Sequence, residues 1–206
     1  MNRRNLVSRG VLVAFTLMLP VAPVAAQQQP DMSRKAVVDD PVAPKRGAAG
    51  YDVSIVELFD YNCPYCRRME PVLNNLLASD PKVRIVYRDW PIFGAPSIEA
   101  ARAALASRYQ GKHAAFNDAL METSGRLDSQ AIQLAAQRAG VDRKRLNADL
   151  AAHKADIDAA LARTARLAEG MDLTGTPAMV IGSYLLPGAA TAEMLVKAVE
   201  IARKPA

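Results

Sequence analysis

The sequence predicts an α/β fold in which a long helical segment interrupts a β-sheet. Residues 53–59 form a nearly continuous apolar run, which is typical of a buried central strand. Residues 83–87 alternate and are rich in β-branched side chains, which favours a second strand of the same sheet. Two short strands, at residues 178–181 and 184–186, are expected near the C-terminus, with a helix after them. Because the residues between the two pairs of strands have helical periodicity, the expected fold class is α/β with a helical insertion.

The predicted insertion covers residues 97–168 and is expected to contain about four helices. Short polar side chains directly before a periodic apolar run are typical N-caps, because they accept hydrogen bonds from the unpaired N–H groups of the first turn. Such residues stand at the expected starts of three helices in the insertion and of the final helix: Ser97, Asp128 or Ser129, Asp142 and Thr191.

Residues 1–26 have the features of a signal peptide. A positive segment with three arginines precedes an apolar run at residues 11–19, and residues 24–26 have the small side chains that a signal peptidase reads. The apolar run is about half the roughly 20 residues that a membrane span needs, which makes an uncleaved anchor the weaker alternative. We therefore expect a soluble, exported mature protein in the periplasm.

Residues 27–50 are rich in Gln, Pro, Asp and Gly and have no sustained periodicity. They are expected to form a mostly flexible leader with one short paired segment near residues 36–38. The main domain is expected to comprise residues 51–96 and 169–206, on either side of the insertion. Because the leader lacks a heptad pattern, a monomer is expected.

The charge pattern argues against nucleic-acid binding. The formal net charge is +5, and part of this excess lies in the expected signal peptide. The other basic residues alternate with Asp and Glu along helical patterns, which is typical of a solvated surface.

The chain has only two cysteines, Cys63 and Cys66, with two residues between them. The pair stands at the start of a predicted helix, directly after the predicted buried strand. The helix N-terminus stabilises negative charge on the first sulfur, so Cys63 is expected to have a lowered pKa and to be the attacking thiolate. Cys66 is expected to be more buried and to resolve the mixed disulfide. The intervening Pro64 and Tyr65 are expected to tune how strongly the reduced form is favoured.

Other uses of a Cys-x-x-Cys pair are weaker alternatives. A zinc site needs two more ligands, and His113 and His153 lie in polar helical stretches that are expected to face solvent. No metal and no cofactor is therefore expected, and an inert structural disulfide is a minor alternative. Two thiolates can bind Cu(I), so a copper carrier or a holding chaperone remains a second hypothesis. Met69 could add a thioether ligand but is expected to pack in the core.

Two further positions fit a redox function. Glu57 is a carboxylate inside the apolar strand, where an unpaired charge is costly. It would exchange protons with Cys66 as the disulfide opens; the alternative is a solvated strand residue. Thr176 and Pro177 precede a predicted strand, and a cis bond between them would place the Thr176 backbone beside the sulfurs to pair with an extended substrate.

Three segments, in this order, resemble the DsbA-like family of thioredoxin-fold proteins: residues 56–66, 88–92 and 174–178. The resemblance covers residues 53–202, nearly the whole expected mature chain. It implies a thioredoxin fold with an inserted helical domain and a thiol–disulfide oxidoreductase that acts on proteins. It also implies that Pro177 is cis, that Thr176 shapes the potential and substrate release, and that Glu57 is the family's buried acid.

The sequence departs from the strongly oxidising members of this family between the cysteines. Those members have Pro-His there, whereas this chain has Pro64 and Tyr65. Tyrosine cannot supply the partial positive charge of histidine, so Cys63 is expected to be less acidic than in those members. The reduction potential is about −120 mV for DsbA and about −200 to −230 mV for glutaredoxins. We expect the potential of the Cys63–Cys66 couple to lie on the glutaredoxin side of this range. The Pro-Tyr pair is also similar to ScsC-type relatives, some of which are isomerases or reductases.

The resemblance leaves the direction of exchange open. The leading hypothesis is an oxidase that introduces disulfides into reduced exported proteins and is reoxidised by a DsbB-like membrane partner. Alternatively, a DsbD-like or ScsB-like membrane partner keeps the pair reduced, and the protein isomerises or reduces misoxidised proteins.

Overall fold

The structure is a computed structural model that describes residues 30–204. The predicted signal peptide, residues 1–26, lies outside the described residues.

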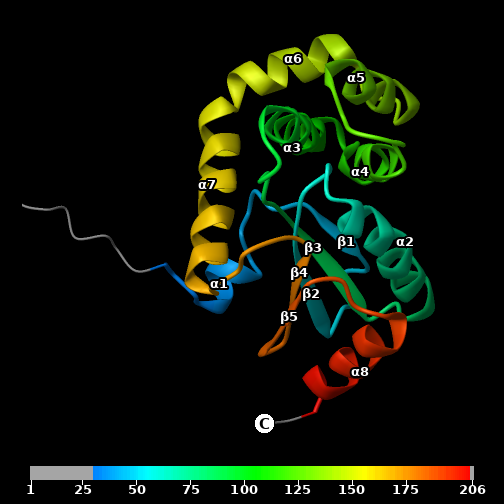
Figure 1. The fold of residues 1–206 in the computed structure, drawn as a ribbon, viewed down its shortest axis with the longest axis vertical. Helices are drawn as coiled ribbons and strands as arrows, with labels where there is room; N and C mark the ends of the chain where they lie inside the picture. The colour runs from blue at the N-terminus through cyan, green and yellow to red at the C-terminus, as the bar shows by residue number, and fades with distance from the viewer. Residues whose placement is uncertain (1–29, 205–206) are drawn as a thin grey trace, which may run out of the picture.

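The centre of the described chain is a five-stranded mixed sheet (Figure 1). Its strands are β1 (Lys45–Gly47), β2 (Val53–Phe59), β3 (Val83–Asp89), β4 (Ala178–Ile181) and β5 (Tyr184–Pro187). The spatial order is β1-β3-β2-β4-β5, with β2 and β3 parallel and the other pairs antiparallel. Every residue of β2 and β3 is buried. Burial on both faces explains the nearly continuous apolar run of β2, whereas β3 also buries the charged residues Arg84, Arg88 and Asp89. The four strands predicted from the sequence are confirmed.

Helices cover both faces of this sheet. The helices α2 (Pro64–Ser79) and α8 (Ala192–Ala202) pack on one face, where their apolar residues join Ile55 and Ile85 in the main core. The short helix α1 (Arg34–Val37) and the long helix α7 (Lys154–Gly170) lie on the other face, on the opposite side of the sheet in Figure 1. The sheet therefore forms the middle layer of three.

The insertion between β3 and β4 consists of five α-helices, one more than expected. Before α7 come α3 (Ala95–Ser107), α4 (His113–Met121), α5 (Ser129–Arg138) and α6 (Arg143–Ala152), with a 3₁₀ turn at Arg108–Gln110. Three predicted N-caps are confirmed, because Asp128, Asp142 and Thr191 accept hydrogen bonds from the backbone of the helices that follow them.

The prediction that Ser97 caps the first inserted helix is wrong. This helix, α3, begins at Ala95 with Gly94 before it, so Ser97 already lies inside the first turn. Its side chain is fully buried, and its hydroxyl accepts a hydrogen bond of 3.0 Å from the Asn62 side chain. The hydrogen bond with the distant Asn62, and not a capping role, accounts for a buried serine at this position.

The prediction of a flexible leader is also wrong for residues 30–50. The stretch that was expected to pair, residues 36–38, lies at the end of α1, and the strand of this segment is β1, which pairs with β3. The sheet therefore begins before the predicted domain start at residue 51. Asp40 anchors the segment through ion pairs with Arg88 (2.9 Å) and Arg163 (2.7 Å). These partners lie far away in the sequence, so no local sequence pattern predicts the ion pairs.

One of the two histidines does not face solvent as predicted. His113 is buried, with its ring centroid 5.4 Å from that of Tyr87. Burial lowers the pKa of His113 to about 3, so it is neutral at physiological pH. His153 is half-buried and stacks on Tyr109 with 3.6 Å between the ring centroids. Within residues 30–204, no group of His, Cys, Asp and Glu is arranged to hold a metal ion.

Candidate active site

The two cysteines lie where the central strand β2 passes into α2. Cys63 is the residue before the first turn of the helix, and Pro64 is the first helical residue, where a missing N–H costs little. Cys66 lies one turn further and is fully buried. Both thiols are free in this structure. Tyr65 projects outward and is 56% exposed.

The position of Cys63 favours its thiolate. The pKa of Cys63 is lowered from 9.0 to about 5, mainly by a hydrogen bond from the Cys66 thiol. Burial opposes this change, whereas the Thr176 side chain and the backbone N–H groups of Cys66 and Tyr65 lower the pKa further. These N–H groups belong to the first turn of α2, which has no other partners for them. The direction of this pKa change agrees with the position of Cys63 at a helix N-terminus, but the Cys66 thiol makes the largest contribution to it.

Thr176 approaches the same sulfur from a distant part of the chain. The Thr176–Pro177 peptide bond is cis, as the family resemblance implied. The Cys63 thiol donates a 3.2 Å hydrogen bond to the Thr176 carbonyl oxygen. Strand β4 starts directly after Pro177, and its pairing with β2 brings this loop to the start of α2. The structure therefore brings Cys63, Thr176 and Pro177 together.

Below the cysteines, Glu57 is held in the middle of β2 without any exposed surface. Neither of its carboxylate oxygens has a hydrogen-bond partner among the described residues. Burial raises the pKa of Glu57 well above its usual value, and the charges of Glu70 and Cys63 raise it further. Burial likewise raises the pKa of the Cys66 thiol, and the charge of Glu57 adds to this effect. Glu57 is therefore buried as predicted and is electrostatically linked to Cys66.

Two other buried acids lie near this site and are not among the residues predicted from the sequence. Glu70 of α2 accepts a 2.9 Å hydrogen bond from Asn117, and burial raises its pKa to about 7. Asp89 ends β3 beside Phe59, has no partner for either carboxylate oxygen, and has its pKa raised to about 8 by burial. A sequence signal existed for Glu70, because it falls on the same helical face as the buried Met69 and Leu73.

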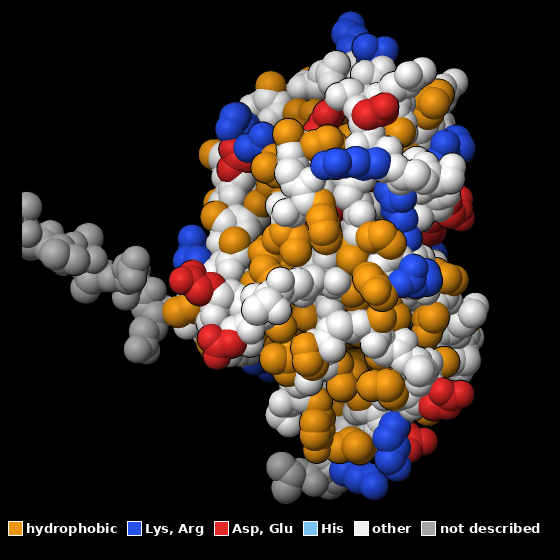
Figure 2. Space-filling view, in the orientation of Figure 1, with side chains coloured by type: hydrophobic (Ala, Val, Ile, Leu, Met, Phe, Trp, Pro, Cys, Tyr) orange, Lys and Arg blue, Asp and Glu red, His pale blue; other side chains and the backbone are white. Residues whose placement is uncertain are grey.

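Hydrogen bonds fix the turn that carries Cys63 to the loop after β3. The Asp60 carboxylate accepts hydrogen bonds from the backbone N–H groups of Asn62 (2.7 Å), Ile92 (2.7 Å) and Phe93 (3.0 Å). Ile92 and Phe93 are exposed, with 40% and 42% of their surface accessible to solvent. Figure 2 shows hydrophobic side chains gathered over the middle of one face of the molecule. Exposed apolar residues therefore stand on a loop that is tied to the cysteine turn.

Known proteins share this fold. The family model of the DSBA-like thioredoxin domain matches residues 54–200. A thioredoxin-like oxidoreductase from Silicibacter pomeroyi DSS-3 is 43% identical, covers 84% of this chain and 99% of its own, and superposes with a TM-score of 0.81. A periplasmic thioredoxin-like protein from Salmonella enterica serovar Typhimurium is 28% identical over 82% of this chain and 94% of its own, with a TM-score of 0.71.

A third solved structure is a thiol–disulfide exchange protein, alpha-DsbA2 from Wolbachia pipientis. It is 25% identical, covers 82% of this chain and 90% of its own, and has a TM-score of 0.77. The predicted thioredoxin fold with an inserted helical domain is thus confirmed.

Curated sequence relatives are longer proteins. The Na⁺/H⁺ antiporter NhaA 1 of Salinispora arenicola (strain CNS-205) is 31% identical over 159 residues, which are 75% of this chain but 24% of the antiporter. The chain therefore spans about a quarter of the length of the curated relatives it matches. Within residues 30–204, no helix has both the length and the hydropathy to cross a membrane.

The family match covers both cysteines, the buried Glu57 and the Thr176–Pro177 loop. The chain belongs to the family of DSBA-like thioredoxin domains, and the domain is of the thiol–disulfide oxidoreductase type.

Proposed function

We propose that this protein oxidises pairs of thiols in exported proteins in the periplasm, using the disulfide between Cys63 and Cys66. The observation that carries the proposal is the difference between the two sulfurs. The pKa of Cys63 is lowered to about 5 at the start of α2, whereas burial raises the pKa of Cys66. A stable Cys63 thiolate is a good leaving group, and a buried Cys66 is protected from external thiols.

The exchange has two steps. A substrate thiolate attacks Sγ of Cys63 in the oxidised protein, which forms a mixed disulfide and releases Cys66 as a thiolate. A second substrate thiolate then attacks the substrate sulfur of the mixed disulfide, which forms the substrate disulfide and releases the Cys63 thiolate. The substrate loses two electrons and the protein gains them.

Glu57 has the role of a proton store for Cys66 in this scheme. Its buried carboxyl has a pKa raised well above the usual value and no hydrogen-bond partner among the described residues, so burial favours its protonated form. It gives the proton to the Cys66 thiolate as the disulfide opens and takes it back as the disulfide reforms. The transfer neutralises the Cys66 thiolate and moves the negative charge to the Glu57 carboxylate.

Thr176 and Pro177 have the role of a backbone contact for the substrate. The Thr176 carbonyl lies 3.2 Å from Cys63 Sγ in the reduced protein. An extended substrate whose cysteine is joined to Cys63 passes beside this loop and can pair with it. Pro64 starts α2, and the exposed Tyr65 contributes to the surface that such a substrate meets.

The acidity of Cys63 supports a reduction potential between those of thioredoxin and DsbA. A pKa of about 5 lies between the values of roughly 7 for thioredoxin and 3.5 for DsbA, and a more acidic thiolate makes a couple more oxidising. The expected partners are reduced exported proteins and a DsbB-like membrane protein that restores the disulfide. A DsbD-like or ScsB-like partner would instead keep the pair reduced, for isomerase or reductase work, and a monomer remains the expected state.

The test uses the purified mature chain in its oxidised form and a reduced, unfolded protein with several cysteines. We expect the substrate to lose two thiols for each Cys63–Cys66 pair that is reduced. Cys63→Ser should abolish this exchange. Cys66→Ser, whose Cys63 is a free thiol, should accumulate a mixed disulfide through Cys63 when it is mixed with a substrate that already contains a disulfide. Exchange that persists in Cys63→Ser would contradict the proposal, as would stoichiometric Cu(I) binding without any turnover of thiols.

A further inference from the structure

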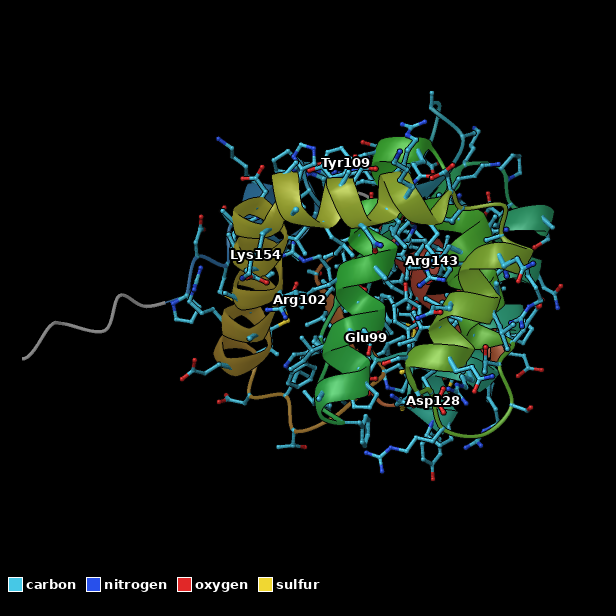
Figure 3. All side chains as sticks on the ribbon, turned by 90° about the horizontal axis from the view of Figure 1, so that it is seen from above. Glu99, Arg102, Tyr109, Asp128, Arg143 and Lys154 are labelled. Atoms are coloured by element: carbon cyan, nitrogen blue, oxygen red, sulfur yellow. The ribbon has the colours of Figure 1, made fainter. Side chains whose placement is uncertain are left out.

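The helical insertion contains a large open pocket that the thiol chemistry does not use. The pocket is bounded by α3, α5 and α6 and has a volume of about 1070 Å³. This is slightly above the roughly 300–1,000 Å³ of typical ligand sites. Figure 3 shows α3 and α5 side by side with α6 across one end of both. Neither cysteine lines the pocket, nor does Thr176.

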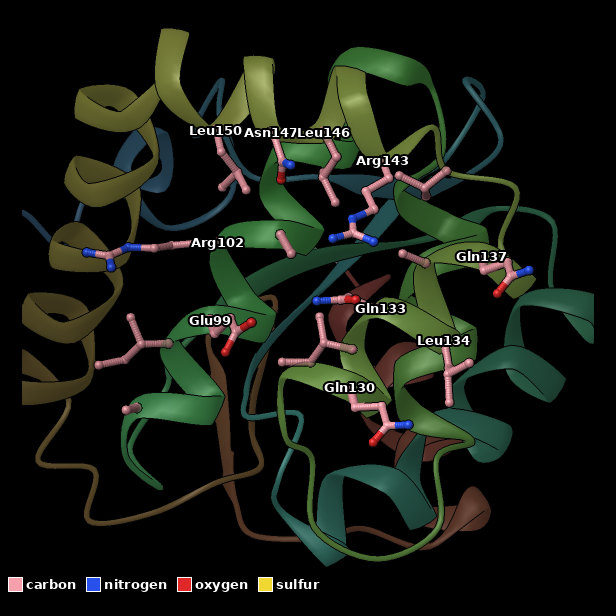
Figure 4. A pocket seen from close by; sticks show the side chains of 16 residues that line it. Glu99, Arg102, Gln130, Gln133, Leu134, Gln137, Arg143, Leu146, Asn147 and Leu150 are labelled. Carbon is pink, nitrogen blue, oxygen red and sulfur yellow. The ribbon is translucent and has the colours of Figure 1, made fainter.

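The pocket contains a cation that has no partner within the described residues. Figure 4 shows the Arg143 side chain pointing from α6 into the space between the three helices. No ion pair joins Arg143 to a carboxylate in residues 30–204. By contrast, Arg102 points away toward α7, where it pairs with Asp158 at 2.8 Å. Arg143 is therefore available to an acidic ligand.

The helix itself gives no reason for a cation at this position. Arg143 is the first residue of α6, and the first turn of a helix favours acidic side chains because of the helix dipole. Asp142 already caps this end by accepting a hydrogen bond of 2.7 Å from the Arg145 N–H. Lys144 and Arg145 lie in the same turn but do not line the pocket, so what distinguishes Arg143 is that its side chain points into it.

The remaining walls combine amide and apolar side chains. Gln130 and Gln133 of α5 and Asn147 of α6 line the pocket, and Figure 4 shows Gln133 reaching into it. Each amide offers both donors and an acceptor, which match the N–H and C=O groups of an extended chain. A helical ligand has already paired these backbone groups and would not need such partners. Leu134 is 48% exposed and supplies an apolar contact at the same wall.

One end of the pocket is tied to the turn that carries Cys63. Asn62, the residue before Cys63, donates to the Ser97 hydroxyl of α3 (3.0 Å) and accepts from the Leu127 N–H just before α5 (2.8 Å). Glu99 of α3, which lines the pocket, accepts a 2.7 Å hydrogen bond from Ser129 at the start of α5. The two helix ends that form this part of the wall therefore lie next to the reactive cysteine.

We propose that this pocket binds an extended, acidic segment of the same polypeptide whose cysteine reacts at Cys63. A carboxylate of the segment pairs with Arg143, its backbone bonds to Gln133 and Asn147, and its apolar side chains contact Leu134. The inference rests on the proposed function, because a protein that oxidises unfolded chains meets its substrates as extended segments. It adds a preference for substrates with acidic residues at a distance from the reactive cysteine.

The test compares three reduced peptides with the same cysteine-containing core. One is the core alone, one has an extension with several glutamates, and one has the same extension with lysines in their place. The oxidised full protein reacts with each, and the second-order rate constant of thiol loss is measured. The glutamate extension should raise this constant about tenfold over the core, since a charge-assisted contact in a pocket is worth about that factor. The lysine extension should give no gain.

Matched variants separate the pocket from overall charge. Arg143→Glu should remove the advantage of the glutamate extension and leave the rate of the core peptide unchanged. Lys144→Glu makes the same charge change in the same helical turn but does not line the pocket, so it should keep the advantage. Leu134→Ser should reduce the advantage in part without any change in charge.

The outcomes distinguish this inference from the proposed function. If the core peptide is oxidised but the glutamate extension gives no gain, the inference is wrong and the function stands. Equal losses in Arg143→Glu and Lys144→Glu would also overturn it. If no peptide is oxidised, the proposed function fails, and anisotropy with a labelled glutamate peptide that lacks cysteine tests the pocket alone. Self-association that Arg143→Glu abolishes would show that a second copy is the occupant, which contradicts the inference.

Discussion

The thiol of Cys63 lies 3.2 Å from the carbonyl oxygen of Thr176, a residue 113 positions away in the sequence. The hydroxyl of the same threonine is buried and has no hydrogen-bond partner among the described residues. A hydroxyl in that place can donate to a thiolate. The Cys66 thiol makes the largest contribution to the low pKa of Cys63, and the Thr176 side chain also lowers it.

Thr176→Val keeps the shape of the side chain and removes this donor. We expect the pKa of Cys63 to rise above about 5, and the couple to become less oxidising, because the thiolate loses a stabilising contact. The ultraviolet absorbance of the thiolate, followed against pH, measures this change. Thr176→Ser retains the hydroxyl and should leave the pKa in place. An unchanged pKa in Thr176→Val would mean that only the backbone of this residue acts on Cys63.

Glu57→Gln is expected to stabilise the protein at alkaline pH. The folded-state pKa of Glu57 is raised, so the folded protein binds its proton more tightly than the unfolded chain does. The protonated Glu57 therefore contributes stability at pH values below its ordinary pKa of 4.5. This contribution is lost as the pH rises through the raised pKa of the folded state. The melting temperatures of Glu57→Gln and the native chain should therefore agree at low pH and diverge as the pH rises, with the variant higher.

The same variant should exchange disulfides more slowly, by about tenfold or more, because Cys66 loses its proton partner. Asp89→Asn is the matched control, since Asp89 is also a buried acid with a pKa raised to about 8. Asp89→Asn should also raise the melting temperature at alkaline pH, but it should not slow disulfide exchange. Equal rates for Glu57→Gln and the native chain would remove Glu57 from the mechanism.

Asp40→Asn should destabilise the fold strongly. It leaves the buried Arg88 without its anionic partner, and breaking a buried ion pair in this way costs about 3–5 kcal/mol. Burial opposes ionisation of Asp40, but the hydrogen bond from Arg163 and the neighbouring charges lower its pKa to about 2. The stabilisation is therefore present above the ordinary pKa of 3.8 and is lost as the pH falls toward 2.

Urea unfolding at neutral pH measures this cost. Asp39→Asn is the control, because Asp39 is the neighbour of Asp40 and also forms an ion pair, with Arg84 of β3. The Asp39 side chain is 45% exposed. This variant should cost less than about 1 kcal/mol. A small effect of Asp40→Asn would show that residues 34–47 contribute little to the stability of the domain.

Tyr65→His tests the argument about the residues between the cysteines. A histidine supplies partial positive charge to the Cys63 thiolate, so the reduction potential should move toward the value of about −120 mV for DsbA. Titration against glutathione measures the potential. Tyr65→Phe changes neither the charge nor the ring and should leave the potential within a few millivolts of the native value. A shift of similar size in both variants would assign the effect to packing on the neighbouring Arg68, whose guanidinium lies 4.3 Å from the Tyr65 ring centroid.

The sequence predicted the parts of this fold that depend on local patterns. The apolar run of β2, the proline at the start of α2, and the caps Asp128 and Asp142 are properties of a few neighbouring residues. The order of strands and helices also indicated the inserted domain.

Predictions failed where a residue is positioned by a distant partner. Asp40 is fixed by Arg163, 123 residues further along the chain, so its segment had the composition of a flexible leader. Ser97 is bonded to Asn62, and His113 is packed on Tyr87, although each lies in a helix that reads as partly polar. The buried Asp89 was missed for a different reason: a polar residue at a strand end normally indicates the beginning of a loop.

The sheet order has a consequence for how the chain reaches its native state. The central strand β2 pairs with β4 through contacts such as Ile55 with Ile181, and the whole helical insertion lies between them in the sequence. One side of β2 therefore stays unpaired until the C-terminal part of the chain arrives, which slows folding and exposes an apolar strand edge to other chains. A chain shortened before residue 178 would keep both cysteines but would be expected to aggregate.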